Sequence, residues 1–206
     1  MSDRVVLLFT KPSEPGRVKT RLIGELTAEQ AAQLHAAFVA DLLERLRGGT
    51  FDLRVAWALE PGETPPEDGE EPGVDAVVQQ GTDLGERLYQ ALSGAAAEAV
   101  AVAAVGSDHP QLQRSDLDAA FDVLQSDKAD VVIGPALDGG YYLLGMKTWQ
   151  RSMFADKHWS TPTVLGDTLA SIQKLSMNYM LLPELRDVDT VDDLGTLRHL
   201  IEHVPG

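Results

Sequence analysis

The 206-residue chain has no cysteine, which excludes disulfides, thiolate metal sites and thiol redox chemistry. Positive charge is also scarce, because 17 lysines and arginines stand against 32 acidic residues, giving a net charge of −15. Nucleic acid and anionic membranes need a basic face on their partner, so the composition argues against both. No apolar run approaches the roughly 20 residues of a membrane span, and the N-terminus lacks a cleavage-site pattern. We therefore expect a cytoplasmic protein, and the composition leaves its oligomeric state open.

Several familiar catalytic motifs are missing as well. The chain contains no G-x-x-x-x-G-K-[ST], G-x-S-x-G, H-E-x-x-H or G-x-G-x-x-G pattern. A nucleotide or catalytic site in this protein must therefore be assembled from another set of residues.

Apolar strand patterns alternate with helix patterns along the chain, and the length fits one domain over residues 1–206. We expect strands at 5–9, 53–59, 76–79, 101–105, 131–133, 141–146 and 179–182, helices at 27–47, 84–99, 115–125, 163–175 and 191–203, and an exposed loop at 60–73. Capping patterns begin two of the helices, Thr27 to Gln30 and Ser115 to Asp118. This alternation predicts an α/β fold with a mostly parallel sheet covered on both faces. In such sheets ligands bind beyond the carboxyl ends of the strands.

The stretch 9–22, FTKPSEPGRVKTRL, concentrates positive charge directly after the first predicted strand. Its four cations and its glycine are Lys11, Arg17, Lys19, Arg21 and Gly16. Arginine can neutralise phosphate oxygens through a planar fork and lysine as a point charge, while glycine lets bare backbone approach a ligand. The alternative is a solvated basic loop, but the position after the first strand favours phosphate binding.

Asp108 follows the predicted strand 101–105, with a glycine before it and a proline after it. A carboxylate in that position can hold Mg²⁺ or Mn²⁺, which take one or two carboxylates together with phosphate oxygens and water. An Asp in a turn before a helix is the alternative reading. Hard cations favour oxygen ligands, so we expect His109 to be a structural or exposed neighbour of this site rather than a ligand.

Asp187 and Asp189 precede the last predicted helix. Alternate residues of an extended segment face the same way, so both carboxylates can converge on one ion. Alternatively, Thr190 is the N-cap of the helix and the following acidic residues favour its positive end. That alternative leaves Asp187 unexplained.

Three other segments carry candidate binding residues. Asp138, Gly139 and Gly140 join two predicted strands, where they can form a hairpin turn, a ligand-binding loop or both. Gln80 follows a strand, and its amide offers the donor and acceptor needed to read a nucleobase edge. Trp159 can line an acceptor site or belong to the core.

Taken in order, six segments resemble one family across nearly the whole chain: FTKPSEPGRVKTRL, QGTDLGERL, VGSDHPQL, GPALDGGYYLLG, HWSTPTVL and DVDTVDDL. The family is a bacterial branch of the glycosyltransferase-A-like nucleotide-diphospho-sugar transferases, related to the guanylyltransferases of molybdenum-cofactor and deazaflavin-cofactor synthesis. The resemblance implies a Rossmann-like three-layer sandwich with a mostly parallel mixed sheet. This sequence departs from the pattern of the sugar nucleotidyltransferases at residues 11–12, where Lys-Pro replaces their glycine-rich turn.

The resemblance also implies roles for individual residues. Lys19 and Arg21 correspond to a catalytic phosphate-binding turn, Asp108 to a catalytic metal ligand, Asp187 and Asp189 to the acidic pair that completes the metal site, and Gln80 to the base-reading position. We therefore expect a transferase that moves a nucleoside monophosphate from a nucleoside triphosphate to a phosphorylated small-molecule acceptor and releases pyrophosphate. Glycosyl transfer from a nucleotide-sugar is the first alternative, and a non-catalytic nucleotide-binding module is the second.

Overall fold

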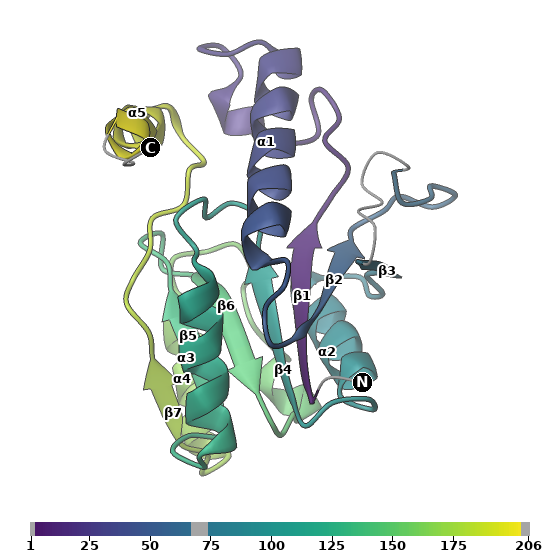
Figure 1. Cartoon of the computed structure of the whole chain (residues 1–206), viewed down its shortest axis with the longest axis vertical. Helices are drawn as coiled ribbons and strands as arrows, with labels where there is room; N and C mark the ends of the chain where they lie inside the picture. Colours follow the sequence, from purple (N-terminus) through teal and green to yellow (C-terminus); the bar gives the residue numbers. More distant parts are fainter. Residues whose placement is uncertain (1–2, 67–73, 203–206) are drawn as a thin grey trace.

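The computed structural model describes residues 3–66 and 74–202, and within them seven strands form one sheet (Figure 1). The strands are β1 (Arg4–Thr10), β2 (Asp52–Trp57), β3 (Asp75–Val78), β4 (Ala101–Gly106), β5 (Val131–Pro135), β6 (Tyr141–Met146) and β7 (Tyr179–Leu181). Their order across the sheet is β3-β2-β1-β4-β6-β5-β7. Strand β6 runs antiparallel to β4 and β5, whereas β1–β2, β1–β4, β2–β3 and β5–β7 pair in parallel. The sheet is therefore mostly parallel and mixed, as predicted.

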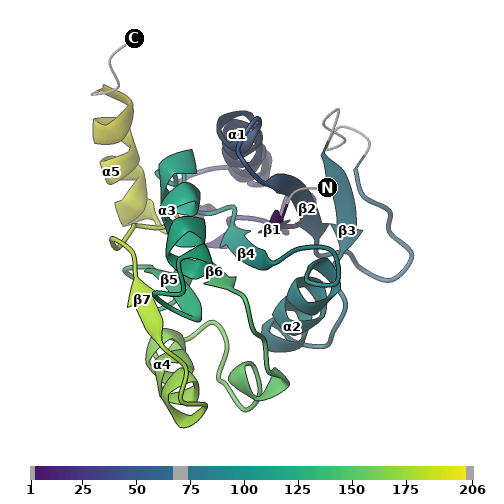
Figure 2. The same cartoon turned by 60° about the horizontal axis from the view of Figure 1, so that its bottom comes forward.

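Helices cover both faces of the sheet (Figure 2). They are α1 (Ala28–Leu46), α2 (Leu84–Ala95), α3 (Arg114–Gln125), α4 (Val164–Lys174) and α5 (Val191–Glu202), together with the short 3₁₀ turns η1 (Thr20–Leu22) and η3 (Arg151–Met153). Helices α1 and α3 lie on one face, and α2 and α4 lie on the other. This arrangement confirms the predicted three-layer sandwich.

The continuous apolar run of β1 explains why both faces are covered. Val6 and Leu8 pack toward α1 and α3, in a core that includes Phe121. Val5 and Leu7 point the opposite way, into the core under α2 and α4. Because side chains alternate across a strand, a strand with no polar interruption requires an apolar layer on each side.

Some predicted boundaries are corrected. The capping box of Thr27 and Gln30 is confirmed, but the N-cap of α3 lies two residues earlier than predicted, at Gln113 rather than Ser115. Helix α2 ends at Ala95, because the backbone tightens into i→i+3 turns at residues 97–98 before β4. Residues 67–73 of the predicted loop and residue 203 of the predicted last helix lie outside the described residues.

The topology brings distant segments to one edge of the sheet. Strands β1, β2 and β4 end there, at the upper edge in Figure 1, and the turn 136–140 between β5 and β6 lies at the same edge. The segment after β7 returns to it through a bridge between Ala136 and Leu185, then leads to α5. Across the described residues, every helix is too short or too polar to cross a membrane.

Candidate functional site

A cleft of about 470 Å³ opens at the carboxyl edge of the sheet. Its walls come from the basic segment 11–21, the end of β4, the turn after β5 and residues 159–164. A second hollow of about 420 Å³ adjoins it on the β1–β2 side and shares Lys11, Lys19, Asp108 and Asp189 with it. The position matches the one predicted from the strand ends.

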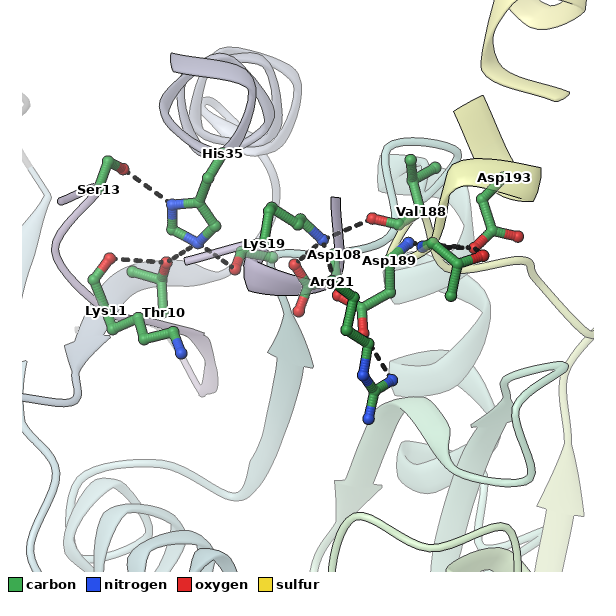
Figure 3. Close-up of polar contacts among 12 residues, drawn as sticks. Thr10, Lys11, Ser13, Lys19, Arg21, His35, Asp108, Val188, Asp189 and Asp193 are labelled. Atoms are coloured by element: carbon green, nitrogen blue, oxygen red, sulfur yellow. Dashed lines mark hydrogen bonds and ion pairs between the residues drawn. The ribbon is translucent and has the colours of Figure 1, made fainter. Parts of the chain in front are cut away.

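Lys19 lies at the boundary of the two hollows, with its side chain only 1% exposed. Its backbone has the left-handed conformation (φ 48°) immediately before η1. The ammonium donates to Asp108 Oδ1 and to the carbonyl of Val188 (2.7 Å), and Nζ lies 3.7 Å from Asp189 Oδ1 (Figure 3). One buried cation therefore joins the basic segment, the end of β4 and the segment before α5.

Asp108 holds its negative charge because of this lysine. Burial alone would raise the pKa of Asp108, but the Lys19 ammonium holds that pKa below its ordinary value. The backbone N–H of Val188 donates to the carbonyl of Asp108 (3.1 Å), which fixes the two segments together. Asp189 lies beside them and accepts from the Arg21 guanidinium (2.9 Å).

The predicted acidic pair, Asp187 and Asp189, divides between two surroundings. Asp189 lines the cleft, whereas Asp187 does not, and burial followed by the negative charge of Asp138 raises the pKa of Asp187. Asp193 accepts from the backbone N–H (2.8 Å) and hydroxyl (2.6 Å) of Thr190, a contact that anchors the start of α5. The helix-start role proposed for this segment therefore belongs to Thr190 and Asp193.

The geometry fits a divalent cation held by two carboxylates. Asp108 and Asp189 already converge on one positive centre, the Lys19 ammonium. Within residues 3–66 and 74–202, no group of three or more histidine and acidic residues is arranged to hold a metal. Two carboxylates suit Mg²⁺ or Mn²⁺ when phosphate oxygens and water supply the remaining ligands.

The remaining residues of the basic segment have different positions. The exposed side chain of Lys11 lines both hollows. Arg17 also lines the cleft, but its guanidinium is paired with Glu14 (2.6 Å) and Glu63 (2.6 Å), and the hydrogen bond to Glu63, followed by that to Glu14, raises its pKa. Gly16 is exposed outside both hollows, where its positive φ (78°) serves the turn.

The turn 138–140 and Trp159 form the far wall of the cleft. Asp138 Oδ1 accepts from the N–H of Gly140 (2.8 Å), which closes the turn. Gly139 has φ +87°, and a Cβ there would lie 2.2 Å from the carbonyl oxygen of Pro162. Gly139 therefore joins the turn to residues 159–164 rather than lining the cleft, whereas Asp138, Gly140 and Trp159 line it.

Comparison with known proteins places this chain in a family. A family model described as "Uncharacterized protein conserved in bacteria (DUF2064)" matches residues 31–161. A Roseiflexus sp. (strain RS-1) protein named phosphoenolpyruvate guanylyltransferase is 30% identical over 195 residues, which cover 92% of this chain and 83% of that protein. The chain belongs to the DUF2064 family.

Solved structures similar to this DUF2064 chain relate it to a wider superfamily. A Desulfovibrio desulfuricans G20 protein provisionally assigned as a nucleotide-diphospho-sugar transferase is 34% identical, with a TM-score of 0.91 over 98% of this chain and 89% of that one. Rv0371c of Mycobacterium tuberculosis H37Rv, solved in complex with manganese, shares the fold at 18% identity and a TM-score of 0.55, over 99% of this chain and 100% of that one. The predicted superfamily is confirmed, and the chain is a transferase of the nucleotidyl or nucleotide-sugar type.

His35, a residue of α1 that lines the second hollow, was not identified as a site residue from the sequence. Its Nδ1 lies 2.8 Å from Ser13 Oγ, and its Nε2 lies 3.4 Å from Thr10 Oγ1 and 3.5 Å from Ser107 Oγ (Figure 3). Burial lowers the pKa of His35 to about 4, so the imidazole is neutral near pH 7. One signal was available, since His35 is a polar residue at the spacing of the apolar stripe of α1.

Of two further positions, Gln80 differs from the prediction and His109 agrees with it. Gln80 is exposed outside both hollows, whereas Gln79 lines the second hollow and donates to the carbonyls of Ala56 (2.8 Å) and Thr10 (3.3 Å). His109 is buried against the Tyr142 ring (5.6 Å between centroids), and burial lowers the pKa of His109 to about 4. This placement agrees with the structural role expected for His109.

Proposed function

We propose that this protein is a divalent-cation-dependent nucleotidyltransferase that joins a nucleoside monophosphate to a phosphorylated small-molecule acceptor. An acceptor phosphate oxygen attacks the α-phosphorus of the triphosphate, the bond from that phosphorus to the β-bridging oxygen breaks, and pyrophosphate leaves. The observation that carries the proposal is the juxtaposition of the cationic segment 11–21 with Asp108 and Asp189 in one cleft. The acidic, cysteine-free composition supports a cytoplasmic location for the enzyme.

The cationic segment suits the triphosphate and the leaving pyrophosphate. Lys11 and Arg21 extend from it toward the cleft, so they can bind phosphate oxygens without unfolding the segment (Figure 3). Asp108 and Asp189 would hold Mg²⁺ or Mn²⁺, a choice supported by the manganese complex of Rv0371c. The cation, when bound, would offset the negative charge of the reacting phosphates. Asp187 does not line the cleft, but the negative charge of Asp138, which does, acts on it.

The second hollow is the proposed nucleoside site. Its lining is neutral where His35, Gln79 and Ser107 meet, and it joins the phosphate-binding region at Lys19. A neutral, hydrogen-bonding wall suits a ribose and a base, which carry no charge. Gln80 is kept as a candidate for contact with the edge of the base, on the resemblance alone. The name of the Roseiflexus relative makes GTP and phosphoenolpyruvate the first substrate pair to test.

Glycosyl transfer from a nucleotide-sugar is the second candidate. The assignment of the Desulfovibrio desulfuricans structure as a nucleotide-diphospho-sugar transferase favours it. Trp159 and Asp138 also provide a wall that suits a sugar ring. The same carboxylates and cations would then bind the departing nucleoside diphosphate. The two reactions differ in the product released, which is pyrophosphate in the first and nucleoside diphosphate in the second.

A binding and product assay tests the proposal. Thermal unfolding is followed with each of the four ribonucleoside triphosphates and with common nucleotide-sugars, with and without Mg²⁺, and a ligand at 100 times its Kd should add about 2.7 kcal/mol to the stability. Release of pyrophosphate is then measured with phosphorylated acceptors, phosphoenolpyruvate first. Asp108→Asn should abolish the Mg²⁺-dependent shift, whereas Asp41→Asn on the exposed face of α1 should not. A shift confined to nucleotide-sugars, with release of nucleoside diphosphate, would replace the first candidate by the second.

A further inference from the structure

The cation position between Asp108 and Asp189 contains the protein's own ammonium group. Lys19 Nζ contacts Asp108 Oδ1, the Val188 carbonyl and, at 3.7 Å, Asp189 Oδ1. The ring centroid of Phe38 lies 5.5 Å behind the same nitrogen. This ammonium is therefore enclosed on several sides, unlike the other cations of the segment.

The contrast with those other cations is informative. The Arg21 side chain is 68% exposed and the Lys19 side chain 1%. Lys11 is exposed, and among residues 3–66 and 74–202 its ammonium has no ion-pair partner. The segment thus presents exposed cations to a ligand while it keeps one buried cation against the acidic pair.

A divalent cation and this ammonium cannot both occupy the space between the two carboxylates. The two positive charges would repel each other at a separation of a few ångströms, in a partly desolvated site where such repulsion is strong. One oxygen of each carboxylate, Oδ1 of Asp108 and Oδ1 of Asp189, already faces the Lys19 ammonium. Binding of the metal therefore requires the ammonium to leave.

We propose that Lys19 is a resident counterion of the free enzyme, and that a divalent cation binds tightly only together with a nucleotide whose phosphates accept the displaced ammonium. The proposal rests on the proposed function, since it concerns the same cleft. It predicts an order of binding in which the metal enters as the metal–nucleotide complex. The backbone of Lys19 can stay in place during the exchange, because its carbonyl is held by the N–H of Leu22 (2.9 Å) and only the flexible side chain must rotate.

The test measures Mn²⁺ binding to the nucleotide-free protein by electron paramagnetic resonance. Lys19→Met removes the resident charge, so its Kd for Mn²⁺ should fall by a factor of about 10 to 100 relative to wild type. Lys11→Met is the matched control, because it removes the same charge from an exposed position of the same segment and should change the Kd by less than about twofold. Adding Asp108→Asn to Lys19→Met should remove the gain.

Lys19→Gln provides a second variant if Lys19→Met does not fold, because the amide can still donate to the Val188 carbonyl. The proposal is overturned if neither Lys19 variant binds Mn²⁺ more tightly than Lys11→Met does. It is also overturned if nucleotide-free wild type binds Mn²⁺ as tightly as Lys19→Gln. Failure of the proposed function gives a different result, in which wild type binds no Mn²⁺ even in the presence of any of the nucleoside triphosphates.

Discussion

Polar side chains have different kinds of partners on the two sides of the cleft. On the β1–β2 side, His35 joins Thr10, Ser13 and Ser107 through neutral hydrogen bonds. On the β4–β5 side, Lys19, Asp108, Arg21 and Asp189 are all charged, and they satisfy one another.

The difference determines how each side can respond to a ligand. Neutral hydrogen bonds between buried groups hold a fixed surface, so the His35 side is preorganised. Charges that are paired with one another must exchange partners before they can bind phosphate or metal. The cleft thus combines a rigid, neutral wall with a charged wall whose contacts must change before a phosphate or a metal can bind.

Asp108→Asn should have the largest effect, because it removes the charge on which the charged side depends. We expect the rate of pyrophosphate release to fall by about a thousandfold, since a catalytic charge and a candidate metal ligand are lost together. The measurement is kcat/KM with the best triphosphate, with Asp41→Asn as control. A decrease of less than tenfold would show that Asp108 is dispensable and would remove it from the proposed site.

Arg21→Ala should have the next largest effect. Its guanidinium is exposed and, among the residues that the structure describes, bonds Asp189 alone, so the fold should tolerate the change. Loss of one phosphate contact should raise the KM for the triphosphate and lower kcat/KM by about 10- to 100-fold. An unchanged KM for the triphosphate would mean that Arg21 does not bind its phosphates.

The fold was largely predictable because its signals are local. Apolar runs such as residues 5–8 define strands that are buried on both faces, and parallel pairing then brings their polar ends to one edge. The presence of Asp108 and Lys19 in one site followed from this topology. The partners of individual charges did not follow, since Arg17 pairs with Glu63, 46 residues away, and a solvated loop predicts no such contact.

Two other differences have a geometric cause. Gln79 and Gln80 are neighbours at the end of β3, and adjacent residues of an extended segment point in opposite directions, so an error of one residue changes the side chain that enters the hollow. His35 was missed because a buried polar residue on a helix resembles an ordinary break in the apolar stripe until its partners are known.

His35→Gln tests the neutral side through the pH dependence of stability. The pKa of His35 is about 4 in the folded protein and near 6.5 when unfolded, so between these values the unfolded state binds more protons. Stability should therefore decrease as the pH falls from about 6.5 to 4, by up to about 1.4 kcal/mol per pH unit for each buried histidine. His109 titrates over the same range, so His35→Gln should reduce this slope by about half rather than abolish it. Urea unfolding at several pH values measures the slope, and an unchanged slope would contradict the assignment.

Arg17→Ala should have the smallest effect of the four. Although Arg17 lines the cleft, its charge is already neutralised by Glu14 and by the half-buried Glu63, and ion pairs near the surface contribute little. We expect kcat/KM to change by less than about twofold, in contrast with Arg21→Ala. A large loss of activity would mean that Arg17 exchanges partners on binding, as we propose for Lys19.

The left-handed backbone of Lys19 has an energetic cost. A non-glycine residue in this conformation costs about 1 kcal/mol or more, and glycine would relieve the cost. Glycine would also remove the ammonium that pairs with Asp108 and donates to the Val188 carbonyl. The strained backbone of Lys19 is therefore offset by the contacts of a positive charge that it places at one point in the cleft.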